Sequence, residues 1–377
     1  MSGPLDGLKV IELAGIGPSP FACMLLADLG ASVLRFERGD ADAEPSTTWD
    51  LLNRSRPSVA MDLKNEAGRM LVLELAEQAD ALIEGFRPGV AERLGLGPDD
   101  LWARNPRLVY GRMTGFGQSG PLAQRAGHDI NYIAISGALW SLGRSDDRPV
   151  PPLNLVGDFG GGALYLAFGV LAAVLSARAT GEGQVVDAAM VDGSASLMTM
   201  THAFLNSGYW REERGANILD TGSHFYEVYE TSDQKFVAVG AIEAKFYSEL
   251  VRVLGLDEGA LPAQMDRAQW PSMKARFAEV FATRSRDEWT ELFESVDACV
   301  TPVLTPSEAA GHPYNTERGV FVAGDVVQPA PAPRFSKTPG SVRQPPRAAG
   351  SGTREGLLEW GIDDKRQAAL REDGAFG

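Results

Sequence analysis

Short apolar runs alternate with helical patterns through the first half of the chain, and this alternation restricts the fold more than any other feature. Strand-like runs lie at residues 8–13, 32–37, 59–63, 81–84 and 108–114. Between them, residues 21–29 and 66–79 place apolar side chains at helical spacing. Strands that alternate with helices build a mostly parallel sheet with right-handed crossovers. We therefore predict an α/β fold with a Rossmann-like layer.

The second half of the chain predicts a different arrangement. An apolar helix is expected to continue to Ala177, followed by a short strand at residues 184–188 and a helix at residues 190–206. Two alternating runs then follow, residues 225–230 and 235–240, which are typical of a β-hairpin. Amphipathic helical patterns come after the hairpin. This stretch therefore predicts a small α+β domain.

The patterns divide the chain into three segments. We expect a large Rossmann-like domain at residues 1–200 and the small α+β domain at residues 220–310. Residues 318–377 are expected to return to the large domain. Within them, residues 329–346 are rich in proline and have no apolar period, which predicts a strap over the surface.

Charge and composition exclude several classes of protein. Apolar residues make up 44% of the chain and charged residues 23%, so a large buried core is possible. The net charge of −15 argues against binding to nucleic acid, because contact with many phosphates needs a concentrated basic surface. A local basic pocket for one small anion stays compatible with this charge.

The two cysteines, Cys23 and Cys299, are too few for a disulfide framework or a cysteine-based zinc site. We expect no metal and a reducing, cytoplasmic location. Residues 1–7 have neither the cationic start nor the apolar run of a signal peptide. The long apolar run at residues 163–177 is shorter than a membrane span requires. We therefore predict a buried helix there and no membrane partner.

A candidate site begins at His128, one of only four histidines. Histidine titrates near neutral pH, and a nearby carboxylate is a common second member of a proton-transfer pair. Thirty residues later, Asp158 is flanked by glycines that let the backbone approach a ligand and leave N–H groups free to hold an oxyanion. A structural His–Asp pair and a simple glycine turn explain the same residues. The residues alone leave both interpretations open.

Cations follow several predicted strands. Because open α/β sheets bind ligands beyond the carboxyl ends of their strands, these side chains could meet phosphates there, although solvated surface charges explain each one singly. The set comprises Arg35, Arg38, Arg54, Arg56, Lys64, Arg87 and Arg93. The first strand-to-helix turn, residues 15–18, lacks the third glycine of a dinucleotide motif and carries proline. The signal for a nicotinamide cofactor is therefore weak.

Longer motifs in this order resemble the family III CoA-transferases, and within them the α-methylacyl-CoA racemases. The motifs occupy residues 8–17, 28–31, 62–64, 84–89, 112–115, 127–132, 151–162, 185–192 and 240–243. Together they cover almost the whole chain. Motifs of this length in this order are far more specific than an isolated glycine pattern.

The resemblance implies an interlocked homodimer whose active sites lie between the large domain of one chain and the small domain of the other. It implies catalytic roles for His128 and Asp158, with Glu243 paired to the histidine across the dimer interface. Asp129 is a further candidate, through the backbone N–H groups beside it. The CoA phosphates are expected to meet Arg38, Arg54, Lys64, Arg87 and Arg93. No separate cofactor is expected, because CoA is part of the acyl-CoA substrate.

The expected reaction inverts the carbon next to a thioester. A proton must leave one face of that carbon and return to the other, so two bases must flank it. His128 and Asp158 would be these bases, and an enolate would form between the two transfers. Transfer of CoA between carboxylic acids, with Asp158 as nucleophile, is the first alternative. A nucleotide-dependent oxidoreductase and a non-catalytic CoA-binding protein are the others.

Overall fold

A computed structural model describes residues 3–38, 50–324 and 326–376. The chain forms two compact units. The large unit comprises Met1–Ser136, Pro152–Met198 and Gly319–Gly377, and the small unit comprises Gly137–Pro151 and Thr199–Arg318. Each unit is described by itself. The domain boundaries predicted from the sequence stay a prediction.

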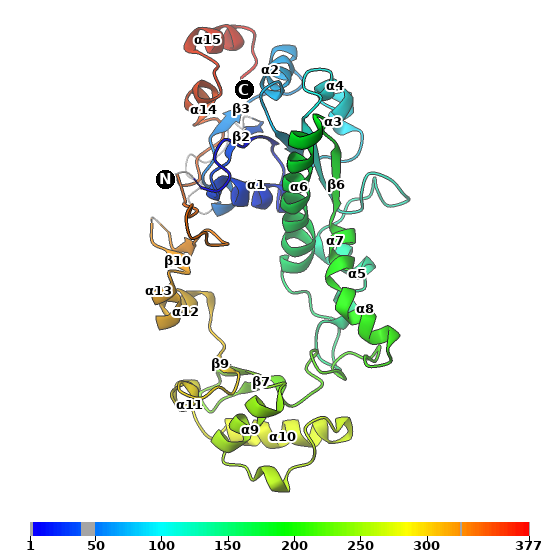
Figure 1. The fold of residues 1–377 in the computed structure, drawn as a ribbon, viewed down its shortest axis with the longest axis vertical. Helices are drawn as coiled ribbons and strands as arrows, with labels where there is room; N and C mark the ends of the chain where they lie inside the picture. Colours follow the sequence, from blue (N-terminus) through cyan, green and yellow to red (C-terminus); the bar gives the residue numbers. More distant parts are fainter. Residues whose placement is uncertain (1–2, 39–49, 325, 377) are drawn as a thin grey trace. The chain divides into compact units, whose positions relative to one another are not determined.

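A parallel six-stranded sheet forms the centre of the large unit (Figure 1). Its strands are β1 (Lys9–Leu13), β2 (Ser32–Glu37), β3 (Ser58–Ala60), β4 (Ala81–Glu84), β5 (Val109–Thr114) and β6 (Val185–Ala189). They lie in the order β3-β2-β1-β4-β5-β6. This is the strand order of a Rossmann fold, in which the chain reverses direction across the sheet between β1 and β4. The predicted fold class is confirmed.

Helices surround this sheet, and most of its strands are buried. The helices of the large unit before the C-terminal segment are α1 (Pro18–Asp28), α2 (Glu66–Ala76), α3 (Val90–Arg93), α4 (Pro98–Trp102), α5 (Asp129–Ile135), α6 (Leu164–Thr180) and α7 (Met190–Leu197), with a 3-10 turn at Leu51–Asn53. Successive strand residues alternate between two apolar cores. Ile11 joins the core that holds Leu71 and Trp360, whereas Val10 joins the core that holds Leu26 and Val170. Burial on both faces explains why these strands read as apolar runs.

Asp158 lies in a helix rather than in the glycine turn that the sequence predicted. Leu155–Ala163 forms a π-helix that continues directly into α6. Phe159 N–H donates to the carbonyl of Asn154 at 3.3 Å, five residues earlier, which is the π-helical pattern. The glycines let this helix pack tightly against α7, because a Cβ on Gly161 would lie 2.6 Å from Ser194 N. A π-helix within a longer helix is rare and often marks a functional site.

The C-terminal segment packs on the first strands of the large unit. It contains β10 (Phe321–Val322), β11 (Gln328–Pro329), α14 (Thr353–Glu359) and α15 (Asp364–Glu372). Residues 320–327 have the sequence pattern of an extended segment, and residue 325 among them lies outside the described residues. Ser341 N–H donates to Asp28 O, and Ser55 N–H donates to Gln344 O, both at 2.9 Å. These bonds fix the proline-rich strap against α1 and the segment before β3.

One continuous helical stretch, Leu155–Thr180, is long and apolar enough to cross a membrane by length and composition, and 44% of its most apolar window is buried inside the protein. Its buried side includes Leu166, Val170 and Val174, which pack in the core beside α1. A core helix passes the same test of length and composition. The helix therefore gives only weak support to a membrane span.

The small unit is built on a three-stranded antiparallel sheet in the order β7-β8-β9. Its strands are β7 (Tyr226–Glu230), β8 (Phe236–Gly240) and β9 (Val300–Pro302). Its helices are α8 (Thr199–Asn206), α9 (Ala244–Val253), α10 (Trp270–Phe281), α11 (Arg286–Phe293), α12 (Pro306–Gly311) and α13 (Pro313–Arg318), with 3-10 turns at Leu139–Ser141, Glu258–Ala260 and Arg267–Gln269. The predicted hairpin is present. The helix predicted at residues 190–206 is instead two helices, α7 and α8.

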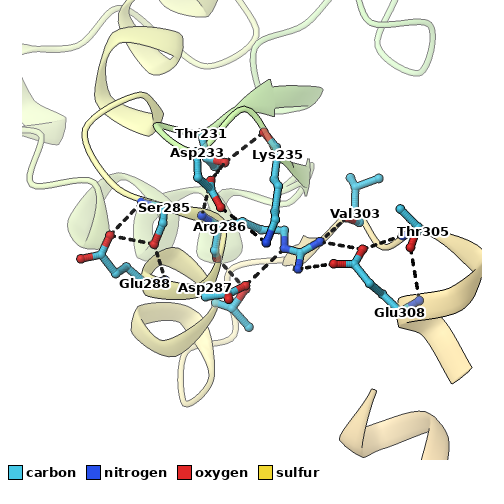
Figure 2. Close-up of polar contacts among 11 residues, drawn as sticks. Thr231, Asp233, Lys235, Ser285, Arg286, Asp287, Glu288, Val303, Thr305 and Glu308 are labelled. Atoms are coloured by element: carbon cyan, nitrogen blue, oxygen red, sulfur yellow. Dashed lines mark hydrogen bonds and ion pairs between the residues drawn. The ribbon is translucent and has the colours of Figure 1, made fainter. Parts of the chain in front are cut away.

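A polar network joins three parts of the small unit (Figure 2). Arg286, at the start of α11, donates from Nη2 to Glu308 Oε1 at 2.8 Å and from Nη1 to Glu308 Oε2 at 3.1 Å. Asp233, in the β7–β8 turn, accepts the Arg286 N–H at 3.0 Å and the Thr231 hydroxyl at 2.6 Å. Because each charged group has a partner, the network fixes α11 and α12 to the hairpin.

Candidate active site

A cavity of about 550 Å³ opens at the carboxyl edge of the large sheet. Its walls come from the segments that follow β1, β4 and β5, from the start of α7, and from the π-helix. In the strand order of this sheet, that place is the crevice between β1 and β4 where the chain reverses direction, and open α/β sheets bind ligands there. The lining includes His128, Asp158, Arg87, Tyr132 and Met190.

His128 stands at the N-terminus of α5 and lines the cavity. Its backbone N–H donates to Asn131 Oδ1 at 3.0 Å, and its carbonyl accepts the Asn131 N–H at 2.8 Å. These two bonds fix the backbone at the first turn of the helix. The imidazole is carried by a backbone that cannot rotate freely, which is what a positioned acid or base needs.

Asp158 reaches the same cavity from the π-helix. Its carboxylate accepts a hydrogen bond from Asn154 Nδ2 at 3.2 Å, and its backbone N–H donates to Asp129 Oδ2 at 2.7 Å. Burial raises the pKa of the Asp158 carboxyl; the Asn154 hydrogen bond opposes this effect and the nearby Asp129 charge adds to it. A carboxyl group with a raised pKa keeps its proton to a higher pH and is therefore better suited to act as an acid.

Asp129 supports the site and does not line the cavity. Its side chain is buried, and Oδ1 has no hydrogen-bond partner among the residues that the structure describes. A Cβ on Gly157 would lie 2.6 Å from Asp129 Oδ2, so only glycine allows this approach. The Asp129 carboxylate therefore holds the backbone of Asp158, and its negative charge disfavours ionisation of the Asp158 side chain.

Glycines on two further segments make room for Tyr132. A Cβ on Gly115 would lie 2.0 Å from the tyrosine ring, and a Cβ on Gly127 would lie 2.8 Å from it. The Tyr132 hydroxyl donates to the carbonyl of Gly127, and its ring packs edge-on against Phe116 at 5.0 Å between centroids. Tyr132 thus anchors the segment just before His128 to the end of β5.

The π-helix crosses α7 at van der Waals contact of the two backbones. A Cβ on Gly193 would lie 1.8 Å from Gly161 O, and a Cβ on Gly161 would lie 2.6 Å from Ser194 N. Both distances are shorter than any real contact of a Cβ atom. The distance between the π-helix, which carries Asp158, and α7 is therefore set by a contact that only glycine permits.

The structure changes the expected source of oxyanion donors. The sequence offered the glycine turn after Asp158 and the backbone beside Asp129 as alternatives. Because residues 155–163 form a π-helix, the N–H groups of its later residues are used in helical bonds. The backbone N–H groups at the start of α5, next to His128, are the better candidates.

The five predicted phosphate-binding cations lie in different places. Arg87 follows β4 and lines the cavity. Arg38 follows β2 and Lys64 follows β3, and both are exposed beyond the carboxyl ends of their strands. Arg93 ends α3, and a Cβ on Gly89 would lie 3.3 Å from its Nη1. These four roles stay predictions.

Arg54 is in a different situation because its guanidinium is buried and paired. Its Nη2 lies 2.6 Å from Asp28 Oδ2, and its Nη1 donates to Gln328 Oε1 at 2.8 Å and to Pro329 O at 2.9 Å. Only 3% of the residue is exposed. All three nitrogens of the guanidinium donate to these groups, so the side chain fits an anchor for the C-terminal strap better than a contact to phosphate.

Glu243 belongs to the small unit. It is the N-cap residue of α9, and its carbonyl accepts the N–H groups of Phe246 and Tyr247, both at 3.0 Å. Its predicted pairing with a histidine stays a prediction.

Sequence reasoning missed two polar residues of the site. Arg125 lines the cavity together with Arg87, and its place three residues before His128 was the available signal. Asn154 hydrogen-bonds Asp158; it lies within the motif at residues 151–162, but no role was predicted for it. Met190, at the start of α7, is buried and also lines the cavity.

In the described part of the chain, no three His, Cys, Asp or Glu side chains are grouped so that they could hold a metal ion.

Comparisons with known proteins agree on one family. The model of CoA-transferase family III matches residues 5–353. Alpha-methylacyl-CoA racemase of Mus musculus is 45% identical over 373 residues, which cover 98% of this chain and 96% of that protein. The racemase of Homo sapiens is 44% identical over 375 residues, with the same coverage. A crystal structure of a CAIB/BAIF family protein from Brucella suis has a TM-score of 0.82 at 26% identity and covers 96% of this chain and 100% of that one.

Proposed function

Because this chain belongs to CoA-transferase family III, we propose that its cavity binds an acyl-CoA thioester, and that the protein is a racemase of 2-methylacyl-CoA thioesters. One observation carries the reaction. His128 and Asp158 come from separate helices and line one cavity, so two proton-transfer groups can reach a single bound carbon. The close similarity to two α-methylacyl-CoA racemases over nearly the whole chain supports the same reaction.

The chemistry follows from the two groups. For one enantiomer, the neutral His128 imidazole takes the α-proton and the protonated Asp158 carboxyl returns a proton to the opposite face. For the other enantiomer the roles reverse, with the Asp158 carboxylate as base and the imidazolium as acid. The raised pKa of Asp158 supports this exchange of roles, because its protonated form persists to a higher pH than that of an ordinary aspartate.

An enolate forms between the two transfers, and its oxygen needs hydrogen-bond donors. We assign this role to the backbone N–H groups at the start of α5, beside Asp129. Each aligned donor of this kind stabilises a transition state by about 3 kcal/mol. The thioester carbonyl would then point to α5, and the α-carbon would lie between His128 and Asp158.

We also propose that the chain acts as a homodimer. The side of α6 away from the core exposes Leu164, Phe168 and Leu175, and Phe168 and Leu175 are 74% and 70% exposed. A continuous apolar stripe of this kind marks an interaction surface. In an interlocked dimer, Glu243 of one chain would orient His128 of the other. Sedimentation analysis tests this arrangement, and Phe168→Glu is expected to dissociate the dimer and to remove activity.

We propose a cytoplasmic location for this chain. The two cysteines form no disulfide, and Cys23 is buried, which suits a reducing cytoplasm. We propose no membrane and no nucleic acid as partners.

Transfer of CoA between acids stays the second candidate, because the family includes transferases and Asp158 is a possible nucleophile. The two reactions differ in what they require. Racemisation needs no acceptor acid, whereas transfer depends on one and passes through an anhydride that hydroxylamine traps.

The experiment is α-proton exchange in heavy water with each pure enantiomer of a 2-methylacyl-CoA thioester. Wild type is expected to incorporate deuterium and to racemise both enantiomers without an acceptor acid. His128→Ala is expected to lose both activities while keeping CoA binding, and His312→Ala serves as the matched control. Absence of exchange with every thioester, together with turnover that needs an acceptor acid, would establish the transferase instead.

A further inference from the structure

Glu84, the last residue of β4, makes a contact that the proposed reaction does not use. Its side chain is buried, with 3% of the residue exposed. Its carboxylate Oε2 accepts the backbone N–H of Phe86 at 2.5 Å. Residues 85–88 form one wall of the cavity, and Arg87 lies on this wall. The Glu84 carboxylate is therefore bonded to the backbone of the residue just before Arg87.

The wall has little freedom to settle elsewhere. On its other side, a Cβ on Gly85 would lie 2.8 Å from Ser19 Oγ, at the start of α1. The wall is thus held between α1 and the carboxylate. Residues 85–88 line the cavity, so a movement of this segment changes the cavity wall.

The ion pair between Glu84 and Arg112 is long. Arg112 lies opposite Glu84 on β5, but its Nε is 3.8 Å from Glu84 Oε1. The guanidinium donates instead to Glu92 Oε1 at 2.5 Å and to Gln118 Oε1 at 2.7 Å. The Arg112 Nε has no hydrogen-bond partner among the described residues.

Other titratable groups facing Glu84 add more negative charge. They are Glu92 on α3 and Asp187 on β6, while the Tyr110 hydroxyl on β5 donates to Leu96 O. The carboxylates of Glu84, Glu92 and Asp187 therefore all lie near the single positive charge of Arg112. Burial and these negative charges raise the pKa of the Glu84 carboxyl above that of an ordinary glutamate.

We propose that Glu84 is a positioning residue, whose ionised carboxylate holds the wall formed by residues 85–88 in the conformation that binds CoA. The proposal rests on the proposed function, because it takes CoA as the ligand. The ionised form is the stronger acceptor, since a hydrogen bond to a carboxylate is roughly twice as strong as one to a neutral acid. Protonation of Glu84 loosens the wall and with it Arg87.

The pH range of this effect follows from the burial of the side chain. Burial raises the pKa of the Glu84 carboxyl to about 7; the Phe86 and Arg112 contacts oppose this rise, and the charges of Glu92 and Asp187 add to it. The carboxylate is therefore ionised above about pH 7 and protonated below it. CoA should bind more tightly on the alkaline side. Repulsion between the Glu84 carboxylate and the negative phosphates of CoA would by itself weaken binding on the alkaline side, so the direction of the change is informative.

The test is titration calorimetry of free CoA with the full chain, compared between wild type and Glu84→Gln across this pH range. The phosphate monoester of CoA also titrates near pH 6, but this effect is common to both proteins and cancels in the ratio of their affinities. We expect a ratio near one at about pH 6, rising to about fivefold tighter binding by wild type at about pH 8. Glu66→Gln is the matched control, because the Glu66 side chain is 85% exposed. The affinity of Glu66→Gln for CoA should equal that of wild type at every pH.

A second variant, Glu92→Gln, tests the role of Glu84 if Glu84→Gln does not fold. Glu92→Gln removes one of the charges that raise the pKa of Glu84, so the change in affinity should move to lower pH. Near neutral pH this variant should bind CoA more tightly than wild type, with equal binding at high pH. In the exchange assay, Glu84→Gln should raise KM at alkaline pH and leave kcat unchanged.

The outcomes separate this proposal from the proposed reaction, because calorimetry needs no turnover. A constant affinity ratio for Glu84→Gln, or an unshifted profile for Glu92→Gln, overturns the role of Glu84 even when α-proton exchange is normal. The expected CoA profile without any exchange overturns the racemase instead. No binding of CoA at any pH overturns both.

Discussion

Gly193→Ala tests the idea that one backbone contact sets the position of Asp158. Gly193 lies in α7, and its Cα touches the π-helix at Gly161. The added Cβ would lie 1.8 Å from Gly161 O and 2.6 Å from Gly161 C. A normal carbon contact is about 3.5 Å, so the two helices must separate by roughly 1.7 Å or tilt. The π-helix carries Asp158, three residues before Gly161, and would move with it.

Two effects of the substitution oppose each other, and their magnitudes decide the result. Alanine in place of glycine inside a helix gains about 1 kcal/mol of helix propensity. Overpacking of a dense interior costs about 1–3 kcal/mol, and a clash with backbone falls at the upper end because no side chain can rotate away. We expect a net loss of about 2 kcal/mol, which lowers Tm by about 4–8 °C in a unit of this size. A displacement of about 1 Å at a reacting group costs about 100-fold in rate.

Calorimetric unfolding and α-proton exchange measure these two quantities. Gly311→Ala is the matched control, because Gly311 ends α12 and no heavy atom lies within 4 Å of its added Cβ. It should leave Tm and exchange unchanged. If Gly193→Ala has the Tm and exchange rate of wild type, the crossing does not determine where Asp158 sits, and the reasoning is refuted.

Three further changes have expected outcomes. Asp158→Asn should abolish exchange without lowering Tm at neutral pH. Because the fold raises the pKa of this carboxyl, its ionisation destabilises the folded state. The stability of the variant relative to wild type should therefore grow as pH rises above about 4. His224, whose Nε2 lies 2.9 Å from Tyr247 Oη, has its pKa lowered to about 4 by burial, so wild type should lose about 3 kcal/mol as pH falls from about 6.5 to 4. His224→Gln should flatten this part of a stability curve measured with urea; an unchanged slope would contradict the assignment. Glu308→Ala should lower Tm at neutral pH, and this difference should vanish in acid. The hydrogen bond from Arg286 lowers the pKa of Glu308 to about 2. The contribution of the Glu308 carboxylate to stability is therefore lost progressively as pH falls from about 4 to about 2. A difference in Tm that persists at about pH 2 would argue against this network.

Local patterns were sufficient for most of the elements. The strands predicted at residues 32–37 and 81–84 have those bounds in the structure, because a strand buried on both faces must be apolar along its length. The helix predicted at residues 190–206 breaks after Leu197, although its apolar spacing continues. The break separates α7, in the large unit, from α8, in the small unit. Spacing along one segment carries no information about which unit each turn packs on.

Because a local pattern does not show which distant residues a side chain contacts, the sequence identified some residues of the site and not others. His128 and Asp158 could be selected from the sequence because each stands in a distinctive motif, and the structure brings both to one cavity. Arg54 also follows a plausible pattern, but it points to Asp28 rather than to the crevice. Arg125 has no motif of its own and nevertheless lines the cavity.

The sequence by itself determined the alternation of strands and helices, the class of the sheet and the pair of groups suited to proton transfer. These features depend on side chains a few positions apart, whose periodicity and chemistry are written in the chain. Tertiary structure alone decided that the glycines after Asp158 form a π-helix and that Arg54 anchors the strap. It also decided that Glu84 lies buried beneath the cavity wall. Each of these depends on which distant backbone or charge comes within a few ångströms, and only the packed fold sets that distance.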